Sequence, residues 1–106
     1  MFLEIACEAV ARGSCLKLDY QSGFIILEAH AVGFDHEHHP AVLGWEHQSP
    51  ADWQHGKWSL LRLDECRNVS VSGYFSEAPR PGWARSDRRF ENLLRSLTFH
   101  VDVSRF

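Results

Sequence analysis

The 106-residue sequence has no long hydrophobic run, which argues against a membrane-spanning helix. Its longest uncharged apolar stretch is centred on SGFII, far short of the length that a span requires. The first residues, MFLEIACEAVARG, contain Glu4 and Glu8 and lack a basic leading segment, so they do not form a secretory signal. We therefore expect a cytoplasmic protein that does not contact membranes.

Cysteine is also scarce. The three cysteines, Cys7, Cys15 and Cys66, are odd in number, and the CxxC spacing of a zinc ribbon does not occur. Each lies among apolar neighbours, so we expect buried free thiols and no disulfide framework.

Basic charge is not in excess, since 11 Lys and Arg residues face 14 Asp and Glu residues, for a formal net charge of -3. This balance argues against a strongly basic nucleic-acid platform but leaves room for a local basic patch. Hydrophobic residues make up 44% and charged residues 24%, which is typical of one folded domain, here spanning 1–106.

The motifs of common enzymes are missing as well. The sequence has no Gly-rich phosphate loop and no nucleophile elbow. Cys66 follows RLDE, but no histidine is adjacent to it. We therefore predict no catalytic residue, no enzymatic activity and no cofactor.

The sequence does show a clear change of hydrophobic period after Gly13. Apolar residues before it recur at helical spacing, and Gly13 stands where a helix C-cap is expected, so we predict a helix over 1–13. From Cys15 onward apolar residues alternate, as in CLKLDY, which is typical of strands. We predict five short strands between residues 15 and 75. The connections are QSG, the hairpin tip DHEHH, the loop SPADWQHG and the junction after KWSLLRLDE.

The segment 76–106 has a different pattern. SEAPRPGWARSD carries two prolines and a glycine and is predicted to be an irregular loop. The apolar residues behind it have helical spacing, with Ser86 or Asp87 as the N-cap, so we predict a C-terminal helix. These apolar residues are Phe90, Leu93, Leu94 and Leu97. The predicted fold is α+β: an antiparallel SH3-like or Sm-like β-barrel of about five strands with an N-terminal and a C-terminal helix.

Four motifs follow one another in a characteristic order. CLKLDYQ ends in Tyr20, LEAH places Glu28 at a strand corner, LLRLDEC contains an Arg-Leu-Asp strand, and APRPGW forms a Pro-Arg-Pro-Gly-aromatic tail. This order resembles the WYL domain and its compact stand-alone bacterial relatives over roughly residues 1–83. The chain departs from the family at 41–43, where AVL replaces the Trp-Tyr-Leu triplet, and at LEAH, where the family usually has proline after glutamate.

The resemblance implies an SH3-like or Sm-like barrel that senses a ligand and is not an enzyme. Such domains look like modules that bind nucleotides or single-stranded nucleic acid at a basic and aromatic surface, and they often follow a winged-helix domain. Only a short helix precedes the barrel here, so we expect any control of transcription to need a partner.

Two candidate binding surfaces combine arginine with aromatic rings. Trp58 and Arg62 lie four residues apart in a predicted strand and share one face at about 13 Å, and Tyr20 and Trp45 could line the same surface. Arginine offers a planar fork for phosphate, and aromatic rings offer stacking platforms. In the competing structural interpretation, Arg62 pairs with Glu28 or Asp64 and the aromatic rings fill the core.

The second surface is APRPGWARSDRR, where four arginines surround Trp83. It is either an anion-binding patch or a solvated loop anchored by Trp83. Taken together, the predicted ligand-binding residues are Tyr20, Trp45, Trp58, Arg62, Arg80 and Trp83.

The hairpin tip DHEHH could bind a divalent metal if it folded back on itself. It contains His36, His38 and His39 with Asp35 and Glu37, and His47 or His55 could add a third histidine ligand. Because side chains of a flexible turn lose entropy on ligation, we interpret it as an exposed polar turn and predict no metal site.

Together these observations predict a non-catalytic ligand-sensing or regulatory module whose ligand is a nucleotide or a single-stranded nucleic acid. The alternative is a protein-interaction module or an oligomerising accessory subunit, with a protein partner or a second copy and no small-molecule ligand.

Overall fold

The computed structural model describes residues 2–20, 23–49, 52–78, 80 and 89–96. These residues form a helix, α1 (Phe2–Arg12), a 3₁₀ turn, η1 (Leu63–Glu65), and six strands. The strands are β1 (Ser14–Tyr20), β2 (Gly23–Asp35), β3 (Pro40–Ser49), β4 (Asp52–Arg62), β5 (Cys66–Phe75) and β6 (Phe90–Ser96).

Helix α1 confirms the predicted N-terminal helix. Its residues Ala6, Ala9 and Val10 are buried against the sheet, as the helical spacing requires. Gly13 follows it with a φ of 71°, and its N–H donates to the carbonyl of Val10 at 3.3 Å. Glycine adopts this left-handed conformation without steric cost, so it ends the helix as predicted.

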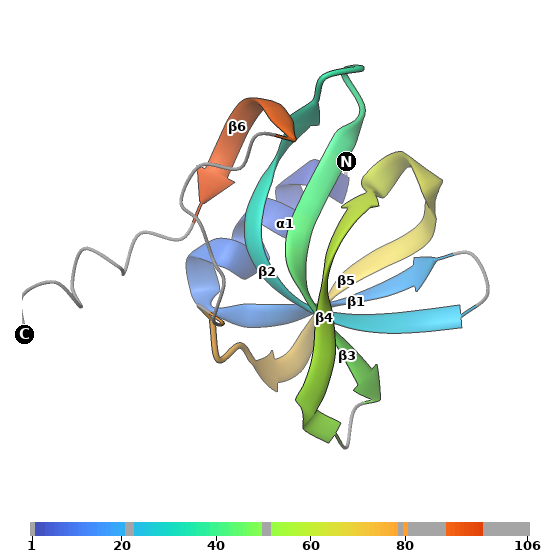
Figure 1. Ribbon diagram of the computed structural model, residues 1–106, viewed down its shortest axis with the longest axis vertical. Helices are drawn as coiled ribbons and strands as arrows, with labels where there is room; N and C mark the ends of the chain where they lie inside the picture. The colour runs from blue at the N-terminus through green and yellow to red at the C-terminus, as the bar shows by residue number, and fades with distance from the viewer. Residues whose placement is uncertain (1, 21–22, 50–51, 79, 81–88, 97–106) are drawn as a thin grey trace, which may run out of the picture.

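The strands form one antiparallel sheet in the order β4-β3-β2-β1-β5, and β6 pairs with β2 (Figure 1). The long strand β2 has two partners on one edge. β1 pairs with its first half, from Gly23 to Glu28, and β6 pairs with its second half, from Ala31 to Asp35. This arrangement makes β2 the centre of the fold.

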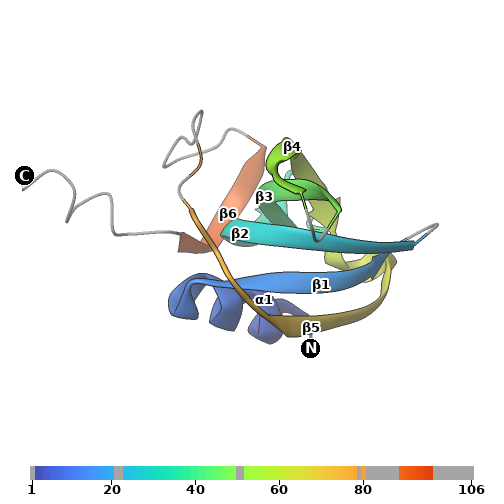
Figure 2. The same cartoon turned by 90° about the horizontal axis from the view of Figure 1, so that it is seen from below.

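The predicted closed barrel is wrong. β4 and β5 stand at the two ends of the strand order, and no pairing joins them in the part of the chain that the structure describes. The sheet curves so that α1, β1 and β5 form one layer below β2 while β3 and β4 lie above it (Figure 2). The sixth strand, which the sequence analysis missed, lies beside β1 on one edge of β2 and does not bridge the two end strands.

The predicted C-terminal helix is also wrong, because Phe90–Ser96 is the strand β6. β1 stops pairing with β2 at Glu28, so the backbone groups from Ala31 onward need another partner, and β6 supplies it. Gly33 permits the close approach, since a Cβ there would lie 2.2 Å from the carbonyl oxygen of Asn92. Leu93 and Leu94, which suggested a helix, are exposed.

Two boundaries differ from the prediction. β3 and β4 remain paired as far as Ser49 and Asp52, so β4 already begins within the predicted loop SPADWQHG. The predicted strand KWSLLRLDE ends at Arg62, and η1 follows.

The core lies between α1 and one side of the sheet, here called the helix side. Alternate strand residues point to it, and they include Leu16, Leu18, Leu27, Val32 and Val42. Val69 of β5 joins this core, as the predicted alternation requires. A smaller cluster lies on the opposite side, where Ala31, Leu43 and Phe90 pack together. No helix of the described residues is long and apolar enough to cross a membrane.

Candidate functional site

A fully buried carboxylate, Glu28, lies on the side of the sheet opposite to α1. Arg80 donates to both of its oxygens, with Nε 2.7 Å from Oε1 and Nη2 3.0 Å from Oε2. His47 Nε2 lies 3.1 Å from Oε2, and the N–H of Glu77 donates to the same atom at 3.2 Å. Burial alone would raise the pKa of Glu28, but these donors hold it below its usual value, so the group is ionised.

His30 is buried beside this carboxylate in a defined protonation state. Its Nδ1 lies 2.7 Å from the carbonyl oxygen of Glu28, and its Nε2 accepts the N–H of Arg80 at 3.0 Å. Because a carbonyl only accepts, Nδ1 carries the proton and the ring is neutral. Burial lowers the pKa of His30 to about 4, in agreement with this tautomer.

Glu28 and His30 are two residues apart in β2, so both face the side opposite to α1. Ala29 pairs with Gly44 and Ala31 with Leu43, so β2 has one extra residue, His30, between two consecutive residues of β3. This bulge brings Ala31 to the same side as well, where it packs with Leu43.

Residues Ser76–Ala78 and Arg80, here called the crossing segment, run from the end of β5 across β1 and β2 (orange in Figure 2). Ser76 N–H donates to the carbonyl of Gly13 at 2.8 Å, and the contacts of Glu77 and Arg80 with Glu28 continue the attachment. The APRPGW and LEAH motifs, far apart in the sequence, thus meet at one buried carboxylate.

Aromatic rings extend this network toward the surface. The rings of His30 and Trp58 meet edge to face at 4.7 Å, and those of Trp58 and Trp45 at 5.6 Å. The guanidinium of Arg80 lies 5.8 Å from the ring of Trp45. Trp45 covers Gly56, where a Cβ would come within 2.5 Å of the indole Nε1. Both indoles are half-buried and expose only part of their rings. This partly exposed surface of Trp45 and Trp58 is here called the tryptophan ledge.

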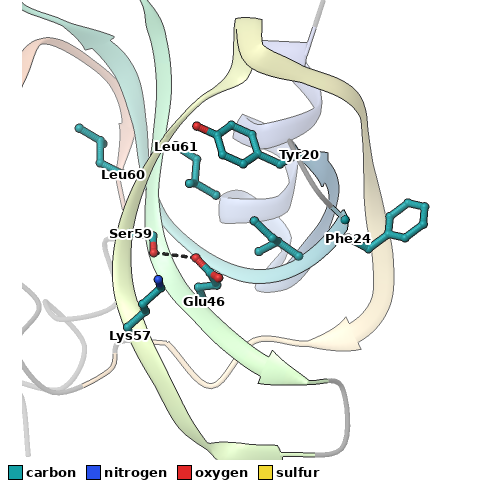
Figure 3. A pocket seen from close by; sticks show the side chains of 9 residues that line it. Tyr20, Phe24, Glu46, Lys57, Ser59, Leu60 and Leu61 are labelled. Carbon is teal, nitrogen blue, oxygen red and sulfur yellow. Dashed lines mark hydrogen bonds between the residues drawn. The ribbon is translucent and has the colours of Figure 1, made fainter.

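A pocket of about 520 Å³ opens on the helix side, between the start of β2 and the strands β3 and β4 (Figure 3). Ile25 and Leu61 give it apolar walls, and the ring of Tyr20 lines one part. This volume lies within the range of small-molecule sites.

The polar groups of the pocket come from β3 and β4. Ser59 donates its hydroxyl hydrogen to Glu46 Oε1 at 2.8 Å, and Lys57 lies beside this pair (Figure 3). Tyr20 is held from outside the pocket, where its hydroxyl donates to Glu65 Oε1 at 2.9 Å. The pocket therefore combines apolar walls, a ring, a cation and hydrogen-bonding groups.

The predicted binding residues do not form one surface. Trp45, Trp58 and Arg80 meet on the side opposite to α1, whereas Tyr20 lines the pocket on the helix side. Trp83 lies outside the described residues.

Arg62 takes part in the ion pair that the structural interpretation foresaw. It donates to both oxygens of Asp64, at 3.0 and 2.7 Å, and lies 3.3 Å from Glu65. The alternative partner considered for it, Glu28, is paired with Arg80 instead.

The hairpin tip is an ordered turn. Asp35 Oδ1 accepts the N–H groups of Glu37 and His39 at 2.9 and 2.8 Å, and His39 Nδ1 lies 3.2 Å from its other oxygen. These hydrogen bonds lower the pKa of Asp35. His36 Nδ1 lies 2.7 Å from Glu91 of β6, while His38 is exposed with a φ of 67°.

The cysteines are free, as predicted. Cys15 and Cys66 are buried as expected, but Cys7 is only partly buried. Burial raises the pKa of Cys15 to about 12 and that of Cys66 to about 11. The Cys66 thiol donates to the carbonyl of Arg62 at 3.6 Å. Neither thiol is activated as a nucleophile.

Sequence reasoning missed His30 and Lys57, and it considered His47 only as a further metal ligand for the hairpin tip. One signal was available: Glu28 is an acidic residue within the apolar run FIILEAHAV, and a buried carboxylate requires cationic or N–H donors. The strand register that brings His47 beside it could not be derived from the sequence.

Comparisons of the chain with protein-family models, with curated proteins and with solved structures found no match.

Proposed function

We propose that this chain is a non-catalytic ligand-binding module and that its ligand occupies the pocket between β2 and β4. The observation that carries the proposal is the pocket itself, a volume of about 520 Å³ between two halves of a curved sheet. Its lining is more polar than apolar: Ile25 and Leu61 supply apolar surface, and β3 and β4 supply a cation, a carboxylate and a hydroxyl that can orient a ligand. The raised thiol pKa values support a binding role over a catalytic one.

The chemistry of the pocket favours a nucleotide or the end of a single-stranded nucleic acid. Tyr20 and the apolar residues Ile25 and Leu61 offer a surface for a planar base. Glu46 can accept from exocyclic amino groups, and Lys57 can pair with a phosphate. Lys57 makes no ion pair with any residue of the described ranges, so its charge is available to a ligand.

The test is isothermal titration calorimetry with mononucleotides, cyclic nucleotides and short single-stranded oligonucleotides. We expect saturable binding that Lys57→Met weakens by roughly tenfold or more, the value of one charge-assisted contact. Tyr20→Leu should weaken it as well. Lys17→Met is the matched control, because Lys17 is an exposed lysine on the other side of the sheet, with its Nζ over the ring of Phe24.

Two results would count against this assignment. Failure of every nucleotide and oligonucleotide to bind removes the ligand class. Binding that survives Lys57→Met and Tyr20→Leu but is lost in Trp58→Leu moves the site to the tryptophan ledge. If Arg62→Ala weakens ligand binding, Arg62 leaves Asp64 to contact the ligand.

A protein-interaction role is the second candidate, and the edge strand β5 favours it. Among the described strands β5 pairs only with β1, and its last residues, Tyr74 and Phe75, are 43% and 81% exposed. An open edge with exposed aromatic rings can accept a strand of a partner. Light scattering after size-exclusion chromatography tests this: a dimer that Phe75→Lys dissociates supports it, and a monomer excludes self-association.

We also propose a cytoplasmic location. The three free cysteines support it, since a reducing compartment keeps buried thiols unpaired.

A further inference from the structure

Three potential metal ligands meet on the side of the sheet opposite to the pocket. The Sγ of Cys15, a carboxylate oxygen of Glu28 and a ring nitrogen of His47 all lie within 4.8 Å of one another, and all three residues are buried. We propose that Cys15, Glu28 and His47 form a binding site for a thiophilic divalent cation such as Zn²⁺.

The distances suit this cation. Zinc–ligand bonds of about 2.0–2.3 Å in a tetrahedral site place ligand atoms about 3.3–3.8 Å apart. His47 Nε2 and Glu28 Oε2 are 3.1 Å apart, and the Cys15 thiol, within 4.8 Å of both other ligand atoms, needs to approach them by about 1.3 Å at most. One sulfur, one nitrogen and one oxygen is a donor set that zinc accepts, with a fourth position for water.

The scaffold positions the three side chains before any metal arrives. Cys15, Glu28 and His47 come from the adjacent strands β1, β2 and β3, and Cys15 is the direct register partner of Glu28. Sites on paired strands are held more firmly than sites on loops. The crossing segment covers them, so entry of a metal requires that segment to move aside.

Binding of a divalent metal displaces a proton from each of two ligand atoms. One is the thiol proton of Cys15, and the other is the Nε2 proton that His47 now directs at Glu28. If the ring is neutral, the latter shifts to Nδ1. The thiolate and the carboxylate then neutralise the cation, and the thiol proton is released.

Arg80 competes most directly with a metal for the Glu28 carboxylate, since it donates to both of its oxygens. It can keep its contact with Oε1 at 2.7 Å while the metal takes Oε2, and Glu77 lies 3.6 Å from it as a second acid. Arg80 then serves as an outer partner that orients the carboxylate. The N–H of Glu77 and the neutral ring of His30 are the other polar groups around Glu28.

The exposed group at the hairpin tip, Asp35, Glu37 and His39, is the internal comparison. It offers no sulfur, and the Asp35 carboxylate already closes the turn. A thiolate signal therefore distinguishes the buried site from adventitious binding at the tip.

The test is titration of the metal-free full chain with Co²⁺ at pH 8, followed by absorption spectroscopy. We expect a thiolate-to-cobalt charge-transfer band and the intense d–d bands of tetrahedral cobalt, saturating at one equivalent and removed by Zn²⁺. Cys15→Ser should abolish the charge-transfer band, and Cys66→Ser, which alters a buried thiol on the helix side, should keep it.

Melting curves give a second readout. Zn²⁺ should raise the melting temperature of the wild type and of Cys66→Ser, but not that of Cys15→Ser. If Cys15→Ser does not fold, Cys15→Ala and His47→Gln replace it, and Zn²⁺ should not raise the melting temperature of either variant. Absence of a thiolate band in the wild type, or its persistence without Cys15, overturns the proposal. The pocket is on the other side of the sheet, so neither result affects the proposed ligand site.

Discussion

Arg80 donates two hydrogen bonds, of 2.7 and 3.0 Å, to the carboxylate of Glu28, a residue 52 positions before it in the sequence. Glu28 is fully buried, and the side chain of Arg80 is 14% exposed. This pair, with the hydrogen bonds of the Ser76, Glu77 and Arg80 N–H groups, fixes the crossing segment across the middle of the sheet.

Removing Arg80 leaves the carboxylate buried without its main partner. We expect Arg80→Ala to lower the free energy of unfolding by about 3–5 kcal/mol, as for other broken buried pairs. Urea denaturation followed by tryptophan fluorescence measures it. Arg62→Ala is the control, since Arg62 pairs with exposed carboxylates and should change stability little. Equal effects of the two substitutions would show that the buried pair contributes nothing special.

His30 should make the protein less stable in mild acid. Its pKa falls from 6.5 to about 4 on folding, so between these values the unfolded chain binds more protons than the folded one. Stability is therefore lost as pH falls, by about 2 kcal/mol between pH 7 and pH 5 from this group. The lowered pKa of Glu28 acts in the same direction, but only at lower pH.

The measurement is the free energy of unfolding from pH 7.5 to pH 5, compared between the wild type and His30→Gln. Glutamine keeps an acceptor for the N–H of Arg80 but does not titrate. The difference between the two curves isolates His30 from the exposed histidines. Parallel curves would mean that folding does not change the pKa of His30.

Gly33→Ala should detach β6 from β2. The new Cβ would lie 2.2 Å from the carbonyl oxygen of Asn92, which is backbone and cannot rotate away. We expect a loss of about 1–3 kcal/mol and faster hydrogen exchange at the β2 amides from Ala31 to Asp35. Gly23→Ala is the matched control in the same strand, because its Cβ would meet nothing within 4 Å. Unchanged exchange in Gly33→Ala would show that β6 does not protect β2.

His38→Gly should stabilise the hairpin tip. His38 has a φ of 67°, which costs a non-glycine residue about 1–2 kcal/mol, while glycine adds entropy to the unfolded chain. The expected net gain is about 0.5–1 kcal/mol by urea denaturation. His36→Gly should lower stability instead, because His36 contacts Glu91 of β6. A loss in His38→Gly would imply a contact of the ring that outweighs the strain.

The order of the first elements could be predicted from the sequence because their signals are local. The helical spacing of Ala6, Ala9 and Val10 and the alternation from Cys15 to Tyr20 depend only on neighbouring residues. β6 could not be predicted in this way. The spacing of its leucines fits a helix, and the strand forms because the distant second half of β2 offers an open edge.

In the site, too, the local motifs could be predicted from the sequence, whereas the contacts between distant segments could not. The motifs LEAH and APRPGW were visible in the sequence, but their meeting at Glu28 depends on a segment that crosses two strands. Tyr20 was assigned to the surface of Trp45 and Trp58 by residue type alone, and strand pairing places it on the other side of the sheet.

The divided edge of β2 has a consequence for how the chain is made. The partner of its first half, β1, leaves the ribosome before it, whereas the partner of its second half ends at Ser96, more than half the chain later. Throughout that interval, the nascent chain carries an unpaired strand edge from Ala31 to Asp35, and such an edge invites pairing with other chains. Emergence of β6, and not the formation of the core, is therefore the step at which this edge of β2 becomes protected.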